Sequence, residues 1–113
     1  MQKKEILNEL KNTYISGITF SGGDPLYVKN LKTVEKLIDE IRVSFPNKTI
    51  WLYTGYTWEY VFGNNSNEPI QNLIRQRIIS KCDVVIDGEY IEELRDITLH
   101  WRGSLNQRVI NVK

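Results

Sequence analysis

The sequence predicts an α/β fold, with a mainly parallel sheet and flanking helices. Three short apolar segments of strand character, 18–20, 49–54 and 83–87, are each followed closely by glycine. Segments with apolar residues at helical spacing separate them, so strands alternate with helices as in right-handed βαβ units. A chain of 113 residues supports one domain, which we place at residues 1–113.

The first half of the chain reads as helix, strand, helix, strand. Lys3–Asn12 has apolar residues at helical spacing and predicts an amphipathic helix before the strand Ile18–Phe20. Asn30 stands where the N-cap of a second helix belongs, and that helix should end before Pro46. Its apolar stripe consists of Leu31, Val34, Leu37, Ile38, Ile41 and Phe45. The second strand follows at Thr49–Thr54.

The second half adds one long helix and two strands. Trp58–Phe62 predicts a short helix or turn, and the polar residues 63–68 predict a surface loop. Pro69 suits the first turn of a third long helix. We expect its buried stripe to be Ile70, Leu73, Ile74, Ile78 and Ile79. Asp83–Asp87 and Val109–Val112 are predicted as the third and fourth strands.

Charge and hydropathy exclude several classes of protein. The chain has 15 basic and 14 acidic side chains, spread along its length, so nothing favours attraction to nucleic acid or to a membrane surface. No apolar run approaches transmembrane length, and the first ten residues lack the apolar core of a signal peptide. We therefore expect a soluble, cytoplasmic protein.

Two reactive side chains receive no chemical role. Cys82 is the only cysteine, so the chain has neither a disulfide framework nor a set of thiolates for zinc or an iron–sulfur cluster. Its place before a buried strand predicts a small core residue. His100 is the only histidine and is more typical of a surface or hydrogen-bonded residue than of a ligand or base.

The strongest candidate for a binding site is the stretch 17–26, GITFSGGDPL. Paired glycines let a ligand approach the backbone closely, and Pro25 favours extended geometry that aims the Asp24 carboxylate out of the strand end. Because the carboxyl ends of parallel strands meet at one rim, this corner should lie near Thr54–Gly55 and Asp87–Gly88. The two aspartates suit a cation or an amino group. The alternatives are that the glycines form only a tight turn and that each aspartate caps a helix or braces a loop.

Four motifs in this order and spacing resemble the activating proteins of anaerobic ribonucleotide reductase, a family of radical S-adenosylmethionine enzymes. They are SGGDPL, WLYTGYTWE, CDVVIDGEYI and WRGSLNQRVI, and the resemblance spans nearly all 113 residues. It implies a partial (β/α) barrel that binds S-adenosylmethionine at the strand ends and cleaves it reductively to a 5′-deoxyadenosyl radical. That radical would take hydrogen from a glycine of the reductase and leave a glycyl radical.

The resemblance also assigns roles to residues. Ser21, Gly22, Gly23 and Asp24 match the glycine-rich motif whose backbone holds the methionyl amino group of the cofactor, and Asp24 stands where many relatives have Glu. Thr54 and Asp87 match places near the cofactor's carboxylate or an accompanying cation. For the segment Trp101–Arg108, substrate docking and cofactor contact are both open.

The departure from the family is at the N-terminus. Members carry a first strand and a Cys-x-x-x-Cys-x-x-Cys loop for a 4Fe-4S cluster, and this sequence has neither. We therefore expect an N-terminally truncated member that is inactive by itself, or alternatively a non-catalytic module that binds an adenosyl ligand or docks the reductase. The implied partners are the large subunit of the reductase and a flavodoxin-type electron donor. The strand at Ile18–Phe20 would lack its neighbour, which predicts a homo-oligomer formed through its exposed edge.

Overall fold

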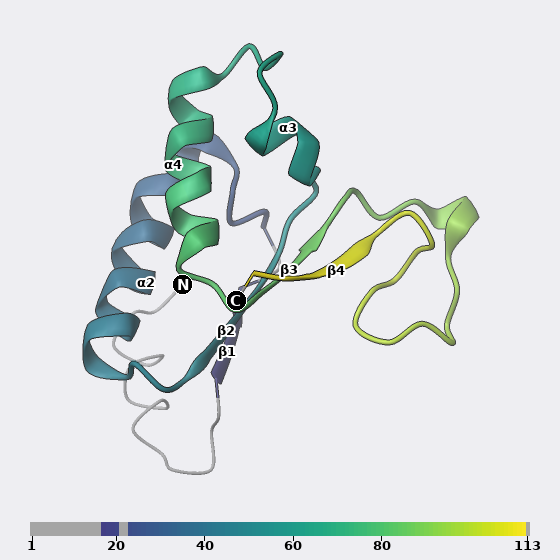
Figure 1. Cartoon of the computed structure of the whole chain (residues 1–113). Coiled ribbons are helices and arrows are strands. Elements are labelled where there is room, and N and C mark those ends of the chain that lie inside the picture. The colour runs from purple at the N-terminus through teal and green to yellow at the C-terminus, as the bar shows by residue number, and fades with distance from the viewer. Residues whose placement is uncertain (1–16, 21–22, 113) are drawn as a thin grey trace.

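The computed structural model describes residues 17–20 and 23–112, which form one sheet with helices against one of its faces (Figure 1). The four strands are β1 (Gly17–Phe20), β2 (Thr49–Tyr53), β3 (Val84–Asp87) and β4 (Arg108–Asn111), in that spatial order. β1, β2 and β3 are parallel, and β4 pairs antiparallel with β3. The predicted α/β fold with a mainly parallel sheet is confirmed, and it is consistent with a piece of a (β/α) barrel. The predicted helix Lys3–Asn12 lies outside the described residues.

The helices occupy the connections between the parallel strands. α2 (Leu31–Ser44) joins β1 to β2 and ends before Pro46 as predicted, and α3 (Trp58–Phe62) and α4 (Pro69–Ser80) join β2 to β3. Two 3₁₀ turns, η1 (Val28–Asn30) and η2 (Glu92–Leu94), lie in loops. No helix within the described ranges is long and apolar enough to cross a membrane.

The core lies between the sheet and the helices. Ile50, Leu52 and Val85 point to the helices and are fully buried, whereas Trp51 and Tyr53 alternate with them and are only half-buried on the opposite face. The buried residues of α2 are Leu31, Val34, Leu37, Ile38 and Ile41, as predicted. Cys82 belongs to the same core, which confirms its prediction as a small buried residue.

The predicted apolar stripe of α4 is partly wrong. Ile70 and Leu73 are 71% and 57% exposed, while Asn72 and Arg75 are buried beside Ile78 and Ile79. Asn72 and Arg75 lie inside because their polar atoms have hydrogen-bond partners there, including the carbonyl oxygens of Tyr60 in α3 and of Leu26 in the loop after β1. Apolar periodicity could not show those partners.

The predicted N-cap position at Asn30 is confirmed, but the Asn30 side chain does not cap the helix. Asn30 has helical φ/ψ and makes no capping hydrogen bond to α2. Its side-chain amide instead donates to the Asp24 carbonyl over 2.9 Å, which draws it towards the loop after β1.

Residues 88–107 form a long excursion between β3 and β4, which we call the arm. Figure 1 shows the arm extending away from the helices. A bridge between Arg95 and Ser104, together with the Leu105 N–H donating to the Leu94 carbonyl over 2.9 Å, ties its two sides together. The arm is therefore a folded part of the domain that returns the chain to the strand ends.

Candidate functional site

The loop after β1 is fastened to the end of β2 by the Asp24 carboxylate. One oxygen accepts from the Leu26 N–H (2.9 Å) and the Thr54 hydroxyl (2.8 Å), and the other accepts from the Gly55 N–H (2.8 Å). The parallel register, with Phe20 opposite Leu52, places the two strand ends side by side. Asp24 and Thr54 are thus brought together as the sequence predicted. Ser21 and Gly22 lie outside the described residues, and Gly23 is exposed with open space beside its backbone.

A buried arginine contacts both the loop after β1 and the loop after β2 from the core side. Arg75 is 0% exposed and donates to the Leu26 carbonyl (2.8 Å), to Asn72 (2.8 Å) and to the Tyr56 hydroxyl (3.2 Å). Its guanidinium also lies 4.2 Å from the centre of the Tyr56 ring, a cation–π contact. The half-exposed Glu68 carboxylate, 3.1 Å away, compensates its charge. Sequence reasoning missed Arg75 because helical periodicity was read from apolar residues alone.

Two hollows open at these strand ends. One, of about 190 Å³, is lined by Asp24, Tyr53, Thr54, Gly55, Gly88, Glu89, Tyr90 and Gln107. The other, of about 290 Å³, is lined by Asp24, Tyr27, Gly55, Tyr56 and Glu89. They share Asp24, Gly55 and Glu89, so they form one continuous rim, which we call the strand-end pocket. A larger hollow of about 580 Å³ has only α2 side chains in its described lining and lacks strand-end residues.

The strand-end pocket has an acidic lining. Asp24 and Glu89 carry its charges, and the described residues that line either hollow include no lysine or arginine. Burial raises the pKa of Tyr53, and burial also raises the pKa of Tyr56 despite the opposing charge of Arg75. Both phenols are therefore neutral near pH 7, and the pocket favours a cationic group.

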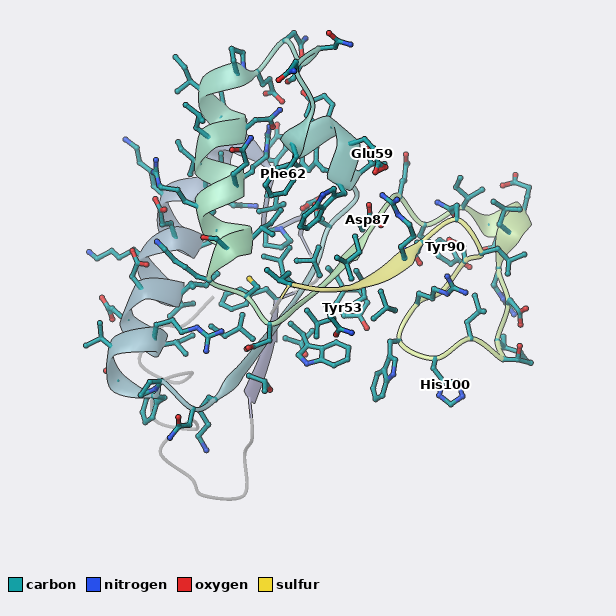
Figure 2. All side chains as sticks on the ribbon, viewed as in Figure 1. Tyr53, Glu59, Phe62, Asp87, Tyr90 and His100 are labelled. Carbon is teal, nitrogen blue, oxygen red and sulfur yellow. The ribbon has the colours of Figure 1, made fainter. Side chains whose placement is uncertain are left out.

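Asp87 has a different environment from the one predicted. Its buried carboxylate accepts from Arg108 and, over 2.8 Å, from the Trp58 N–H at the start of α3. Arg108 also contacts Glu59, and these hydrogen bonds raise the pKa of the Arg108 guanidinium. Figure 2 shows Asp87 and Glu59 on the α3 side of β3, with Tyr53 on the other side. The Asp87 side chain lines neither hollow, and its role as a cofactor-binding residue stays a prediction.

Six lining residues were not among the predicted rim or cofactor-binding residues, namely Tyr27, Tyr53, Tyr56, Glu89, Tyr90 and Gln107. Tyr53 ends β2, Glu89 and Tyr90 follow Gly88 at the end of β3, and Gln107 precedes β4. The strand-end rule applied to Asp87–Gly88 reaches Glu89 if it is extended by one residue beyond the glycine. Gln107 has no strand-end signal, but it belongs to the segment Trp101–Arg108, for which the family resemblance leaves cofactor contact open, and the folded arm brings it to the rim.

The described residues do not fit an iron–sulfur cluster. Cys82, the one thiol in the sequence, is fully buried, and its Sγ lies 3.4 Å from the Ile78 carbonyl oxygen. It also precedes β3, at the opposite end of that strand from the pocket. Among the described residues no group of three or more His, Cys, Asp or Glu side chains is placed to hold a metal ion.

Comparison with known proteins defines the class. A family model described as a 4Fe-4S single cluster domain matches residues 1–110. The chain therefore belongs to the 4Fe-4S single cluster domain family. No solved structure matches it.

Closer relatives share a particular name, anaerobic ribonucleoside-triphosphate reductase-activating protein. The chain is 35% identical to that of Escherichia coli (strain K12) over 111 residues, which cover 96% of this chain and 66% of that protein. It is 38% identical to that of Enterobacteria phage T4 over 106 residues, covering 94% and 60%. With the Haemophilus influenzae protein the identity is 35% over 117 residues, covering 100% and 68%. The chain thus spans about two thirds of the length of these relatives.

Proposed function

We propose that this chain forms the S-adenosylmethionine-binding strand ends of an activating protein for anaerobic ribonucleotide reductase. In the complete activity, S-adenosylmethionine is cleaved reductively and the resulting 5′-deoxyadenosyl radical produces a glycyl radical on the reductase. The observation that carries the proposal is the strand-end pocket, whose acidic lining and exposed backbone lie where the matched motifs converge. The named relatives support the reductase as the partner.

The ligand's chemistry suits the pocket. S-adenosylmethionine has two positive groups, the sulfonium and the amino group, and the pocket offers carboxylates without a neighbouring lysine or arginine in the described lining. Both Asp24 oxygens already accept protein hydrogen bonds, whereas no described residue donates to the Glu89 carboxylate. Glu89 is therefore the carboxylate that we assign to the cationic part of the ligand, and Asp24 holds the rim in shape.

Reductive cleavage needs an electron that the family obtains from a 4Fe-4S cluster. The sequence offers one thiol, and it is buried in the core. We therefore propose that these 113 residues alone bind the ligand without cleaving it, and that a cluster and a flavodoxin-type donor act through another polypeptide segment. The second candidate function, favoured by the same cysteine count, is a non-catalytic module that binds an adenosyl ligand or docks the reductase.

Anaerobic incubation with S-adenosylmethionine and dithionite tests whether these residues cleave the ligand by themselves. We expect no 5′-deoxyadenosine from the chain alone, as measured by chromatography. Stoichiometric 5′-deoxyadenosine would show that these residues suffice for cleavage and would overturn the proposed division.

Calorimetric titration tests the ligand. S-adenosylhomocysteine lacks the sulfonium charge, so S-adenosylmethionine should bind about fivefold more tightly, corresponding to roughly 1 kcal/mol of solvent-screened attraction. Glu89→Gln should remove this preference, and Glu93→Gln, at an exposed arm residue that lines neither hollow, should keep it. Equal affinity of the wild type for both compounds, or no heat at millimolar ligand, would contradict the assignment.

Self-association is a further part of the proposal. β1 lies at one edge of the sheet formed by the described strands. A strand edge is a template for pairing with another chain, so we propose a homo-oligomer formed through β1. Light scattering at several concentrations tests this, and a mass that stays monomeric throughout would contradict it.

A further inference from the structure

We propose that Gly103, Asn106 and Gln107 are positioning residues that hold the loop Gly88–Tyr90 in its ligand-binding shape. The inference rests on the proposed ligand site and gives a role to the part of the Trp101–Arg108 segment that sequence reasoning left open. It comes from three separate contacts, each between the returning side of the arm and the loop that lines the pocket.

The Gln107 side chain uses both ends of its amide. Its oxygen accepts from the Gly103 N–H (2.8 Å) and the Ser104 N–H (3.1 Å), and its nitrogen donates to the Gly88 carbonyl over 3.0 Å. Gln107 is 8% exposed, so these bonds are shielded from water. One amide therefore connects the returning side of the arm to Gly88, the first residue of the pocket loop.

Asn106 makes the same kind of connection one residue further along. Its amide nitrogen donates to the Glu89 carbonyl over 2.7 Å, and its oxygen accepts from the Ser104 hydroxyl over 2.6 Å. The Ser104 hydroxyl in turn accepts from the Ile91 N–H over 3.2 Å. The backbone on both sides of Tyr90 is thereby fixed by the arm.

The Tyr90 ring packs directly against the backbone of Gly103. A Cβ atom at Gly103 would lie 2.9 Å from two carbons of that ring, so a larger residue would displace it. Tyr90 lines the smaller hollow together with Gln107. Glycine at 103 therefore lets Tyr90 close that side of the pocket.

The loop needs such support because its backbone is unusual. Gly88 has φ +95, a conformation that side-chain-bearing residues rarely adopt, and its N–H makes only a long hydrogen bond of 3.3 Å to the Tyr56 carbonyl. The Asn106 and Gln107 amides bind the two carbonyls that follow. These two amides therefore determine where Glu89 enters the pocket. Gln107 also lines the pocket, whereas Asn106 does not.

Gln107→Glu is the sharpest test, because the introduced carboxylate still accepts from Gly103 and Ser104 but cannot donate to the Gly88 carbonyl. Gln76→Glu is its matched control, since the half-buried Gln76 amide donates to the Val61 carbonyl over 2.8 Å, away from the pocket. Calorimetry with S-adenosylmethionine and thermal melting are measured on both variants. We expect about tenfold weaker binding for Gln107→Glu and less than about twofold change for Gln76→Glu, at comparable losses of melting temperature.

Binding by Gln107→Glu within about twofold of the wild type would overturn the inference. If the wild type itself does not bind S-adenosylmethionine, the proposed function fails. Hydrogen exchange then tests the positioning role without ligand, through the protection of the loop's backbone amides. In that experiment Gln107→Glu should speed exchange at the Gly88 and Ile91 amides. Gln76→Glu should leave exchange at these two amides as in the wild type. Unchanged exchange at both amides would reject the positioning role.

The wild-type chain supplies a test that needs no variant to fold. On addition of S-adenosylmethionine, the side-chain amide resonances of Asn106 and Gln107 should shift in ¹⁵N spectra, and that of Gln76 should stay in place. Binding without a shift at either Asn106 or Gln107 would contradict the inference.

Discussion

The Thr54 hydroxyl donates a hydrogen bond to the Asp24 carboxylate over 2.8 Å, and this contact joins the loop after β1 to the end of β2. With the Gly55 and Leu26 amides also donating, the carboxylate has three fixed partners. Asp24 therefore acts first as a brace, one of the two roles that the sequence left open for it. The pocket that it shapes receives its accessible charge from Glu89.

Thr54→Val tests this brace. The substitution removes the donor to Asp24 and an acceptor of the Tyr56 N–H at 3.2 Å, so we expect a loss of about 1–2 kcal/mol in the free energy of unfolding and weaker S-adenosylmethionine binding. Thr98→Val is the control, because the Thr98 hydroxyl makes a comparable bond to Asp96 in the exposed arm. Urea denaturation and calorimetry measure both effects. Equal effects of the two substitutions on binding would argue against the brace.

Glu68→Gln tests the compensation of the buried Arg75. It removes the carboxylate charge next to a guanidinium that is 0% exposed, so we expect a loss of about 1–3 kcal/mol in the free energy of unfolding. Glu92→Gln removes the partner of Arg95 in an exposed pair at 3.5 Å and should cost about 0–1 kcal/mol. Equal losses in urea denaturation would show that Glu68 does not compensate Arg75.

Acid stability depends in part on Glu35. The hydrogen bond from Arg77 holds its pKa below the usual value of 4.5, with Lys81 adding to the effect against the opposing influence of burial. A carboxyl whose pKa is lower in the folded state stabilises it above the unfolded pKa, and this contribution is lost as pH falls through the folded pKa. Glu35→Gln should therefore lower the melting temperature at pH 7 and have little effect at pH values below the folded pKa.

Glu93→Gln is the comparison for this experiment, because no described residue bonds to the exposed Glu93 carboxylate. Its melting temperature should follow the wild type at both pH values. A Glu35→Gln difference that is the same at acidic and neutral pH would contradict the ionic origin of the effect.

Anaerobic reconstitution with iron and sulfide tests the cysteine argument. One buried thiol per chain leaves too few ligands for a 4Fe-4S cluster, so we expect no stoichiometric four-iron species after desalting. Absorption and electron paramagnetic resonance spectra measure it. A stable four-iron spectrum would contradict this account, and Cys82→Ser would then show whether that thiol is involved.

The sequence predicted the strands well because each has a strong local pattern. Gly17–Phe20, Thr49–Tyr53 and Val84–Asp87 are short apolar runs, and their order with the helices indicated a mainly parallel sheet. The same rule placed Asp24 and Thr54 together, because parallel strands end at one edge.

Long-range polar contacts could not be predicted in the same way. Arg75 is buried in place of Ile70 and Leu73 because Leu26, Tyr56 and Glu68 meet it from other parts of the chain. Asp87 follows the strand-end rule in its backbone, but Arg108, 21 positions away, holds its side chain on the α3 side. Such partners are set by the folded chain and leave no local pattern.

The most direct test of the central claim is a ¹⁵N NMR titration of the chain with S-adenosylmethionine. The account predicts that the amide resonances of Gly55, Gly88 and Glu89 shift together and saturate, while those of Lys36 and Glu40 beside the larger hollow on α2 stay in place. Shifts that centre on α2, or no saturable shift at the strand ends, would contradict it.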